Sequence, residues 1–219
     1  MNYAAPSTTS ANWPAYTDAQ GNVWYGTVFG DVGGENKITN GSFFASEVEG
    51  SMNIGVTSNA GKISSATDGL IFYYTRLPAG TNFTLSATAT INDMAANNQV
   101  SFGLMARDDL YIDSYVKDTM GDYVAAGTRN QGAFNGFGRK SGVLVNGPAA
   151  EVVYAVGDTV ELKIVGTADG YTLTYGENTP VSAGFDYALT TVDSDYIYVG
   201  FYAVRNANIT FTNVKLVTD

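Results

Sequence analysis

The chain has 219 residues, 45% of them hydrophobic and 13% aromatic, so it can bury a core without disulfides and is not a disordered tail. Acidic residues outnumber basic ones by 21 to 11, and the resulting net charge of −10 disfavours nucleic acid as a partner because phosphates are repelled. Cysteine and histidine are both absent, which excludes thiol nucleophiles, thiolate metal sites and histidine-based triads. Since no stretch is long and apolar enough to cross a bilayer, we expect no membrane partner.

The N-terminal segment differs in composition from the rest of the chain. Residues 2–22 are rich in Ser, Thr, Ala, Pro, Asn and Gln, which is typical of linkers. We therefore predict a linker or N-terminal arm over residues 1–22 and a single domain over residues 23–219. The start of the chain lacks the basic and apolar regions of a signal peptide, and we expect the natural polypeptide to be longer.

From residue 23 onward the pattern is one of short strands separated by Gly, Asn and Asp turns. The clearest strand covers residues 83–91, where apolar odd positions alternate with Thr or Ser at even positions. Further strands are predicted over residues 69–75, 99–107, 122–127, 136–140, 159–165, 171–175, 196–205 and 209–216, with a hairpin turn at 167–170. So many strands without helices between them predict an all-β fold, a two-sheet antiparallel β-sandwich of jelly-roll or concanavalin-like type.

Two of these strands carry a second face that is not simply polar. Opposite the apolar faces of residues 99–107 and 196–205 lie Ser101, Gly103, Met105 and Arg107, and Tyr196, Tyr198, Gly200, Tyr202 and Val204. Glycine in a strand indicates close approach by another group, and sugar rings stack on aromatic side chains. The two faces together predict a shallow, exposed carbohydrate-binding trough. In the alternative, the tyrosines form a second apolar layer beneath a loop and the glycines mark bulges.

Basic residues near strand ends complete the candidate site. Arginine can donate two parallel hydrogen bonds to a carboxylate, so these residues could recognise uronic acids. In the alternative, each arginine pairs with a neighbouring aspartate. The candidate carbohydrate-binding residues are Tyr198, Tyr202, Arg107, Arg139, Lys140, Arg205 and Asn206.

A run of aspartates between residues 108 and 122 suggests calcium as a cofactor. Calcium takes several oxygen ligands, often from one loop, and the candidate ligands are Asp113, Asp118 and Asp122. The spacing does not match the EF-hand loop, and a solvated acidic loop is the alternative interpretation.

The sequence offers little support for catalysis. A glycosidase needs two carboxylates across a cleft, and no compact pair of glutamates on one strand marks such a site. A Tyr or Lys base could serve a lyase, but no Tyr-x-Lys segment lies beside a supporting Arg and Gln strand. We therefore predict no catalytic residue and an accessory module of a carbohydrate-active enzyme.

Four separated motifs follow one another along the chain. They are Gly61-Lys62-Ile63-x-x-x-x-Asp68-Gly69-Leu70-Ile71-Phe72-Tyr73-Tyr74-Thr75, Phe83-x-Leu85-x-Ala87, Gly103-Leu104-Met105-x-Arg107-Asp108 and Tyr198-Val199-Gly200-Phe201-x-Ala203-x-Arg205-Asn206-Ala207. In this order they resemble the non-catalytic region of large secreted bacterial pectate lyases, over most of residues 61–216. The resemblance implies an extracellular β-sandwich attached to an enzyme that degrades plant polysaccharide. It carries over no binding residue, and it implies no lyase activity because the parallel β-helix that cleaves pectate is absent.

Our leading hypothesis is a secreted, non-catalytic carbohydrate-binding module that targets an appended enzyme to plant cell-wall polysaccharide, with pectin or a related glycan favoured. Its expected partners are the polysaccharide and the appended catalytic domain. The first alternative is a structural or adhesive spacer domain of a secreted or surface protein. The second is a polysaccharide lyase that acts without histidine.

Overall fold

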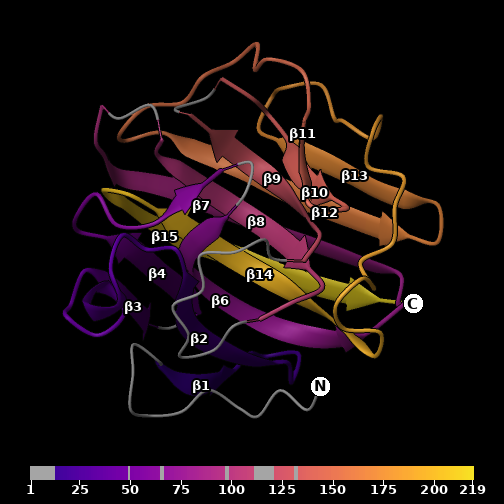
Figure 1. Cartoon of the computed structure of the whole chain (residues 1–219), viewed down its shortest axis with the longest axis horizontal. Coiled ribbons are helices and arrows are strands. Elements are labelled where there is room, and N and C mark those ends of the chain that lie inside the picture. The colour runs from indigo at the N-terminus through magenta and orange to yellow at the C-terminus, as the bar shows by residue number, and fades with distance from the viewer. Residues whose placement is uncertain (1–12, 49, 65–66, 97–98, 111–120, 131–132) are drawn as a thin grey trace.

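The computed structural model describes residues 13–48, 50–64, 67–96, 99–110, 121–130 and 133–219. Figure 1 shows two β-sheets stacked face to face. Outside the strands, the described residues form a three-residue 3-10 helix, η1 (Glu35–Lys37). They contain no helix that is long and apolar enough to span a membrane. The predicted two-sheet antiparallel β-sandwich is confirmed.

The larger sheet, sheet A, has the strand order β1-β2-β6-β14-β8-β9-β10-β11, with β5 also paired to β6. Its strands are β1 (Trp13–Thr17), β2 (Val23–Gly30), β5 (Lys62–Ile63), β6 (Asp68–Pro78), β8 (Ser101–Arg107), β9 (Tyr123–Arg129), β10 (Phe137–Lys140), β11 (Val143–Asn146) and β14 (Tyr196–Val204). The smaller sheet, sheet B, has the order β13-β12-β7-β15-β4-β3. Its strands are β3 (Phe43–Val48), β4 (Ser51–Val56), β7 (Phe83–Met94), β12 (Thr159–Thr167), β13 (Gly170–Tyr175) and β15 (Ala207–Thr218).

The last two strands of the chain lie at the centre of the fold. In sheet A, β14 lies between β6 and β8, and Figure 1 shows it crossing the middle of the molecule. In sheet B, β15 lies between β7 and β4. Each sheet is therefore built from strands that are far apart in the sequence.

The main core fills the space between the sheets. In β7, Leu85, Ala87 and Ile91 are buried, as the alternation of apolar and hydroxylated residues predicts. From β14, Phe201 packs at the centre, with its ring centroid 5.2 Å from that of Trp24 and 4.7 Å from that of Phe211. The hairpin predicted at residues 167–170 is also confirmed.

Sheet A begins earlier in the sequence than the predicted domain boundary at residue 23. Residues 13–17 form β1, which pairs with β2 at the edge of the sheet. The turn between them is organised by Asp18, whose carboxylate accepts hydrogen bonds from the backbone N–H of Gln20 and from the backbone and side chain of Asn22. It also accepts one from Trp24 Nε1, at 2.9 Å. Burial raises the pKa of Asp18, but these four hydrogen bonds outweigh burial and leave the pKa lowered.

Candidate functional site

The outer face of sheet A, where the trough was predicted, is a second buried core. Tyr198 is 1% exposed and Tyr202 is 0% exposed, so the prediction that these rings are exposed is wrong. The alternative interpretation, a second apolar layer, describes this face correctly. Its buried members, here called the outer core, are Phe29, Ile63, Leu70, Phe72, Tyr74, Met105, Leu110, Tyr123, Ala125, Phe137, Tyr198, Tyr202 and Val204.

The strand glycines have a different role from the predicted one. A Cβ added at Gly200 would collide with the backbone of Tyr73 and Tyr74 on the neighbouring strand. One added at Gly103 would collide with the backbone between residues 126 and 127. The group that approaches these glycines is therefore the adjacent strand, and neither position gives evidence for a bound sugar.

The hydroxyl groups of the two tyrosines are used within the fold. The Tyr202 hydroxyl lies 2.9 Å from Ser101 Oγ, which donates a hydrogen bond to the carbonyl of Thr128. The Tyr198 hydroxyl donates to Asp193 Oδ2 at 2.6 Å. Burial raises the pKa of Tyr202 well above its ordinary value, so this phenol stays protonated at neutral pH.

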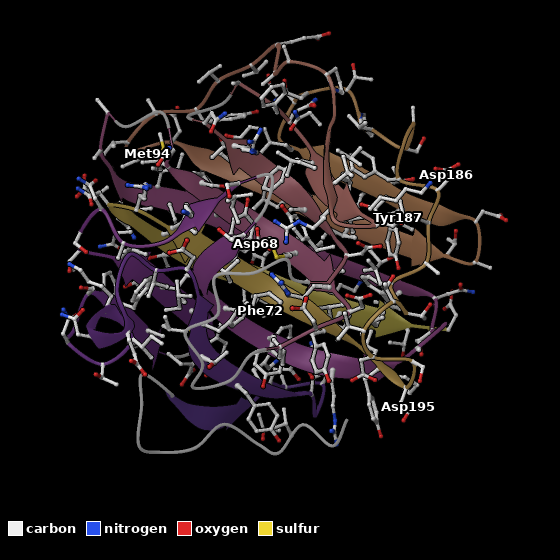
Figure 2. All side chains as sticks on the ribbon, viewed as in Figure 1. Asp68, Phe72, Met94, Asp186, Tyr187 and Asp195 are labelled. Atoms are coloured by element: carbon white, nitrogen blue, oxygen red, sulfur yellow. The ribbon has the colours of Figure 1, made fainter. Side chains whose placement is uncertain are left out.

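Two of the predicted arginines lie in a fully buried ionic cluster beside these rings. Arg139 binds Asp68 through two hydrogen bonds of 2.9 Å each, and Arg107 binds Asp109 Oδ1 at 2.8 Å. A further ion pair of 3.5 Å joins Arg107 to Asp68, and all four side chains are 0% exposed. Both guanidinium groups also lie over the ring of Tyr123. Figure 2 labels Asp68, the residue that links the two arginines.

This buried pairing corrects the prediction that Arg107 and Arg139 are available to an external carboxylate. Burial raises the pKa of Asp68, while the charges of the two arginines oppose that shift. Because an unpaired charge is very costly inside a protein, the cluster acts as one structural unit. The alternative interpretation, in which each arginine pairs with an aspartate of the fold, is correct for both Arg107 and Arg139.

The other three candidate residues lie elsewhere. Lys140 is exposed, 3.5 Å from Asp186, and its ammonium lies over the ring of Tyr187. Arg205 and Asn206 follow β14, at the opposite end of the strand from Tyr198. The Arg205 side chain donates to a backbone carbonyl at 3.3 Å. The predicted residues therefore do not form one exposed surface: four of them lie on the buried outer face of sheet A, and three do not join them.

The calcium prediction rests mainly on residues outside the described part of the chain, since Asp113 and Asp118 both lie there. Asp122 is 4% exposed and accepts hydrogen bonds from Thr191 Oγ1 at 3.1 Å and from the backbone N–H of Gly142 at 3.4 Å. Among the described residues, no three acidic side chains are arranged to hold a metal ion. Calcium binding stays a prediction.

Asp108 lies next to this segment and is fully buried. Its Oδ2 accepts hydrogen bonds from the backbone N–H groups of Thr191 at 2.6 Å and Val192 at 3.2 Å. Burial, together with the nearby charges of Asp109 and Asp122, raises the pKa of Asp108 to about 6. A carboxyl group with a raised pKa makes the stability of the fold depend on pH.

Stability is expected to fall as pH rises because Asp108 is more easily protonated in the folded state than in the unfolded chain. Its contribution is fully present below the unfolded pKa, near 4, and is lost as the pH rises through the folded pKa of about 6. Relative to Asp108→Asn, the wild-type free energy of unfolding should fall by on the order of 2 kcal/mol between about pH 4 and about pH 7. Urea unfolding of both proteins across this range measures the difference. A pH-independent difference would contradict the assignment.

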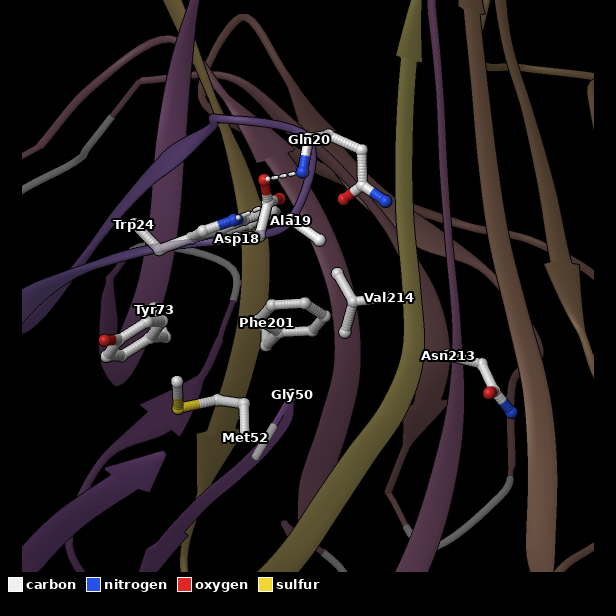
Figure 3. Close-up of a pocket in the computed structure, with 10 residues that line it drawn as sticks. All are labelled: Asp18, Ala19, Gln20, Trp24, Gly50, Met52, Tyr73, Phe201, Asn213 and Val214. Carbon is white, nitrogen blue, oxygen red and sulfur yellow. Dashed lines mark hydrogen bonds between the residues drawn. The ribbon is translucent and has the colours of Figure 1, made fainter. Parts of the chain in front are cut away.

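The structure shows a pocket that the sequence did not predict. It has a volume of about 260 Å³ and lies between the sheets, beside the turn that joins β1 and β2. Figure 3 shows the side chains that line it, which are Asp18, Ala19, Gln20, Trp24, Gly50, Met52, Tyr73, Phe201, Asn213 and Val214. Its apolar part includes three aromatic rings from sheet A, and its polar part comes from turns and from a bulge in β15. An apolar concave surface with a few polar groups is typical of a small-molecule site.

A second, smaller pocket of about 130 Å³ lies beside the turns at Gly80 and Ala168. Tyr171 and Tyr187 contribute to its lining, and burial raises the pKa of Tyr171 to about 12. The described residues of its lining include no charged side chain. The larger pocket is therefore the better candidate site, because it has about twice the volume and its lining includes a carboxylate.

The fold places the chain among the lectin-like two-sheet sandwiches. The chain aligns with lectin II from Ulex europaeus at 12% identity and a TM-score of 0.51, covering 97% of this chain and 99% of the lectin. It also aligns with a Bacillus subtilis protein of unknown function with a galectin-like fold, at 8% identity and a TM-score of 0.53, covering 88% of each chain. At these identities the likeness concerns the fold alone.

The family follows from the sequence comparisons. The family described as pectate disaccharide-lyase N-terminal domain matches residues 25–111 and 115–219, and the chain belongs to it. Pectate lyase L of Thermoclostridium stercorarium is 32% identical over 165 residues, which are 75% of this chain and 13% of that protein. The pectate disaccharide-lyase of Dickeya chrysanthemi is 32% identical over 202 residues, and the match covers 76% of this chain and 27% of that protein. The chain thus spans less than a third of these relatives, and the predicted resemblance to pectate lyases is confirmed.

Proposed function

We propose that the chain is a non-catalytic carbohydrate-binding module that holds an appended pectin-degrading enzyme on plant cell-wall polysaccharide outside the cell. The observation that carries the proposal is the family match to the N-terminal domain of pectate disaccharide-lyases. Most of the length of both lyase relatives lies beyond the matched part, which leaves room there for a separate catalytic domain. The lectin-like sandwich is a fold compatible with sugar binding.

The chemistry of the described residues also favours binding over catalysis. The chain has no histidine, and Tyr123 and Tyr202 of the outer face are buried with raised pKa values. A lyase base must reach the proton it removes and must ionise near the working pH. Tyr123 and Tyr202 meet neither condition, so we place neither of them in a reaction.

One observation favours the spacer alternative. The aromatic face that was predicted to bind sugar is filled by the outer core, and its two candidate rings, Tyr198 and Tyr202, are 1% and 0% exposed. A spacer would bind no glycan, whereas a module would bind through the pocket or through exposed residues such as Lys140. A measurement of glycan binding therefore distinguishes the two functions.

Titration calorimetry against fragments of homogalacturonan, methyl-esterified pectin, xylan, β-glucan and xyloglucan makes that measurement. We expect binding of a pectic fragment with a free energy of about −4 to −8 kcal/mol, which corresponds to millimolar to micromolar affinity. Chemical-shift changes in the folded protein provide an independent readout. No heat and no shift change with any of the glycans would favour the spacer.

Calcium is proposed as a cofactor on the basis of the acidic segment, with Asp113, Asp118 and Asp122 as ligands. Calcium added to chelator-treated protein is expected to raise the melting temperature, because a ligand that binds only the folded state stabilises it. Magnesium at the same concentration is the control, and Asp118→Asn should reduce the calcium effect. An unchanged melting temperature would count against the site.

A further inference from the structure

The pocket beside the β1–β2 turn has one feature that restricts its ligand. Among the described residues that line it, Asp18 is the single charged side chain, and none is a lysine or an arginine. The Asp18 carboxylate is fixed by its hydrogen bonds to the turn and to Trp24, and Figure 3 draws those from Gln20 N–H and from Trp24 Nε1. Those contacts also keep its pKa low, so the carboxylate stays ionised at neutral pH.

The apolar part of the pocket faces this carboxylate. In Figure 3 the ring of Phe201 and the side chain of Val214 lie between Asp18 and Gln20 on one side and Met52 on the other. Phe201 is in contact with Trp24, so the aromatic surface continues into the core. Trp24, Tyr73 and Phe201 are 1%, 3% and 2% exposed, so these rings form the closed floor of the pocket, which can receive a small ester group but does not offer a ring face for stacking on a sugar.

The side chain of Gln20 is an uncharged amide near the mouth of the pocket. Gln20 is exposed, and its backbone is held by Asp18 Oδ1 at 3.0 Å. The amide of Asn213, from the bulge in β15, points away from the pocket and donates from Nδ2 to Thr88 Oγ1 at 3.1 Å. Amide groups can both donate to and accept from hydroxyl or ester oxygens.

An anionic ligand fits this pocket poorly. A free uronate would bring its carboxylate close to that of Asp18, and the described lining supplies no cation to offset the repulsion, in a chain of net charge −10. Like charges brought together at an interface weaken binding substantially. At about 260 Å³, the pocket also lies just below the usual size range of ligand sites, so it suits one sugar residue rather than an oligosaccharide.

We propose that this pocket binds the methyl ester of an esterified galacturonate residue in a pectic glycan, and discriminates against the free uronate. The inference rests on the proposed function and adds the identity of the site and the charge state of its ligand. It places recognition at the edge of the sandwich, away from the outer face of sheet A. Specificity then comes from Asp18, Gln20 and the aromatic surface.

The experiment compares two oligogalacturonides of the same length, one fully methyl-esterified and one de-esterified, by titration calorimetry in the presence of a chelator. The chelator prevents calcium from bridging carboxylates. The wild type is expected to bind the esterified fragment at least about tenfold more tightly. Ala19→Trp, which places a large side chain at the mouth, should weaken that binding about tenfold or more.

Two further variants separate charge from shape. Gln20→Arg supplies a cation at the mouth and should raise affinity for the de-esterified fragment severalfold, which a purely structural role of this turn would not do. Ala183→Trp is the matched control for Ala19→Trp, because both alanines are exposed and lie in two-residue turns, and Ala183 lines neither pocket. It should leave both affinities unchanged, and melting temperatures check that every variant folds.

The possible results test the pocket assignment separately from the proposed function. Equal binding of both fragments, or binding that Ala19→Trp does not change, overturns the pocket assignment and leaves the proposed function in place. Absence of binding to either fragment and to every other glycan tested overturns both. Preference for the esterified fragment that is lost in Ala19→Trp and reduced in Gln20→Arg supports the inference.

Discussion

Replacing Asp68 with alanine is expected to lower the free energy of unfolding by about 3–5 kcal/mol, because two buried guanidinium groups would lose their shared counter-charge. Desolvating a charge is costly, and Arg139 and Arg107 have no route to water in the folded state, since both are 0% exposed. Urea unfolding followed by fluorescence measures the change. A protein this weakened could also give little soluble material, so Asp68→Asn, which keeps the shape of the side chain, is measured alongside it.

The matched control is an ion pair of similar length at the surface. Lys140 and Asp186 lie 3.5 Å apart with side chains that are 46% and 74% exposed, so Asp186→Ala should cost no more than about 1 kcal/mol. If Asp68→Ala cost as little as this control, the cluster would have to be hydrated rather than buried. A large loss in Asp68→Asn as well would show that charge, rather than packing, dominates the effect.

Tyr202→Ala is expected to cost about 3–5 kcal/mol, the range for removal of a buried aromatic side chain. Tyr202→Phe keeps the ring and removes the contact with Ser101 Oγ, so its cost should be about 1 kcal/mol. Tyr196 lies on the same face of β14 and is partly exposed, and Tyr196→Ala should therefore cost clearly less than Tyr202→Ala. Urea unfolding of the three variants gives these values.

The same variants test the role first predicted for this face. A residue that binds glycan at the surface would change affinity and leave stability nearly unaltered. We expect the reverse for Tyr202: a large loss of stability, and, in the Phe variant, glycan affinity equal to that of the wild type. A stable Tyr202→Ala protein with lost glycan binding would restore the trough as the site.

The fold could be predicted from the sequence because its strands carry local signals. Residues 83–91 alternate strictly, and the inward faces of β8 and β14 are apolar at every second position. The burial of the outer face was harder to predict, yet a signal for it exists. Residues 69–75 form a continuous apolar run with no alternation, which is typical of a strand covered on both faces.

The site could not be predicted from local patterns. Asp68 and Arg139 are 71 positions apart, so their pairing depends on the sheet topology rather than on spacing. The pocket was missed for a related reason. Composition places Asp18 and Gln20 in a linker, and strand alternation places Phe201 in the core. Only the folded chain brings these residues to one cavity.

The central positions of β14 and β15 also determine when the chain can fold as it is synthesised. Until residues 196–218 leave the ribosome, β6 and β8 in one sheet, and β4 and β7 in the other, lack the strand that joins them. The edges of these strands that β14 and β15 will occupy stay unpaired during that interval, and such edges are sites where chains associate wrongly. Because most pairings are distant in sequence, folding is expected to be slow and to complete only after translation of the domain.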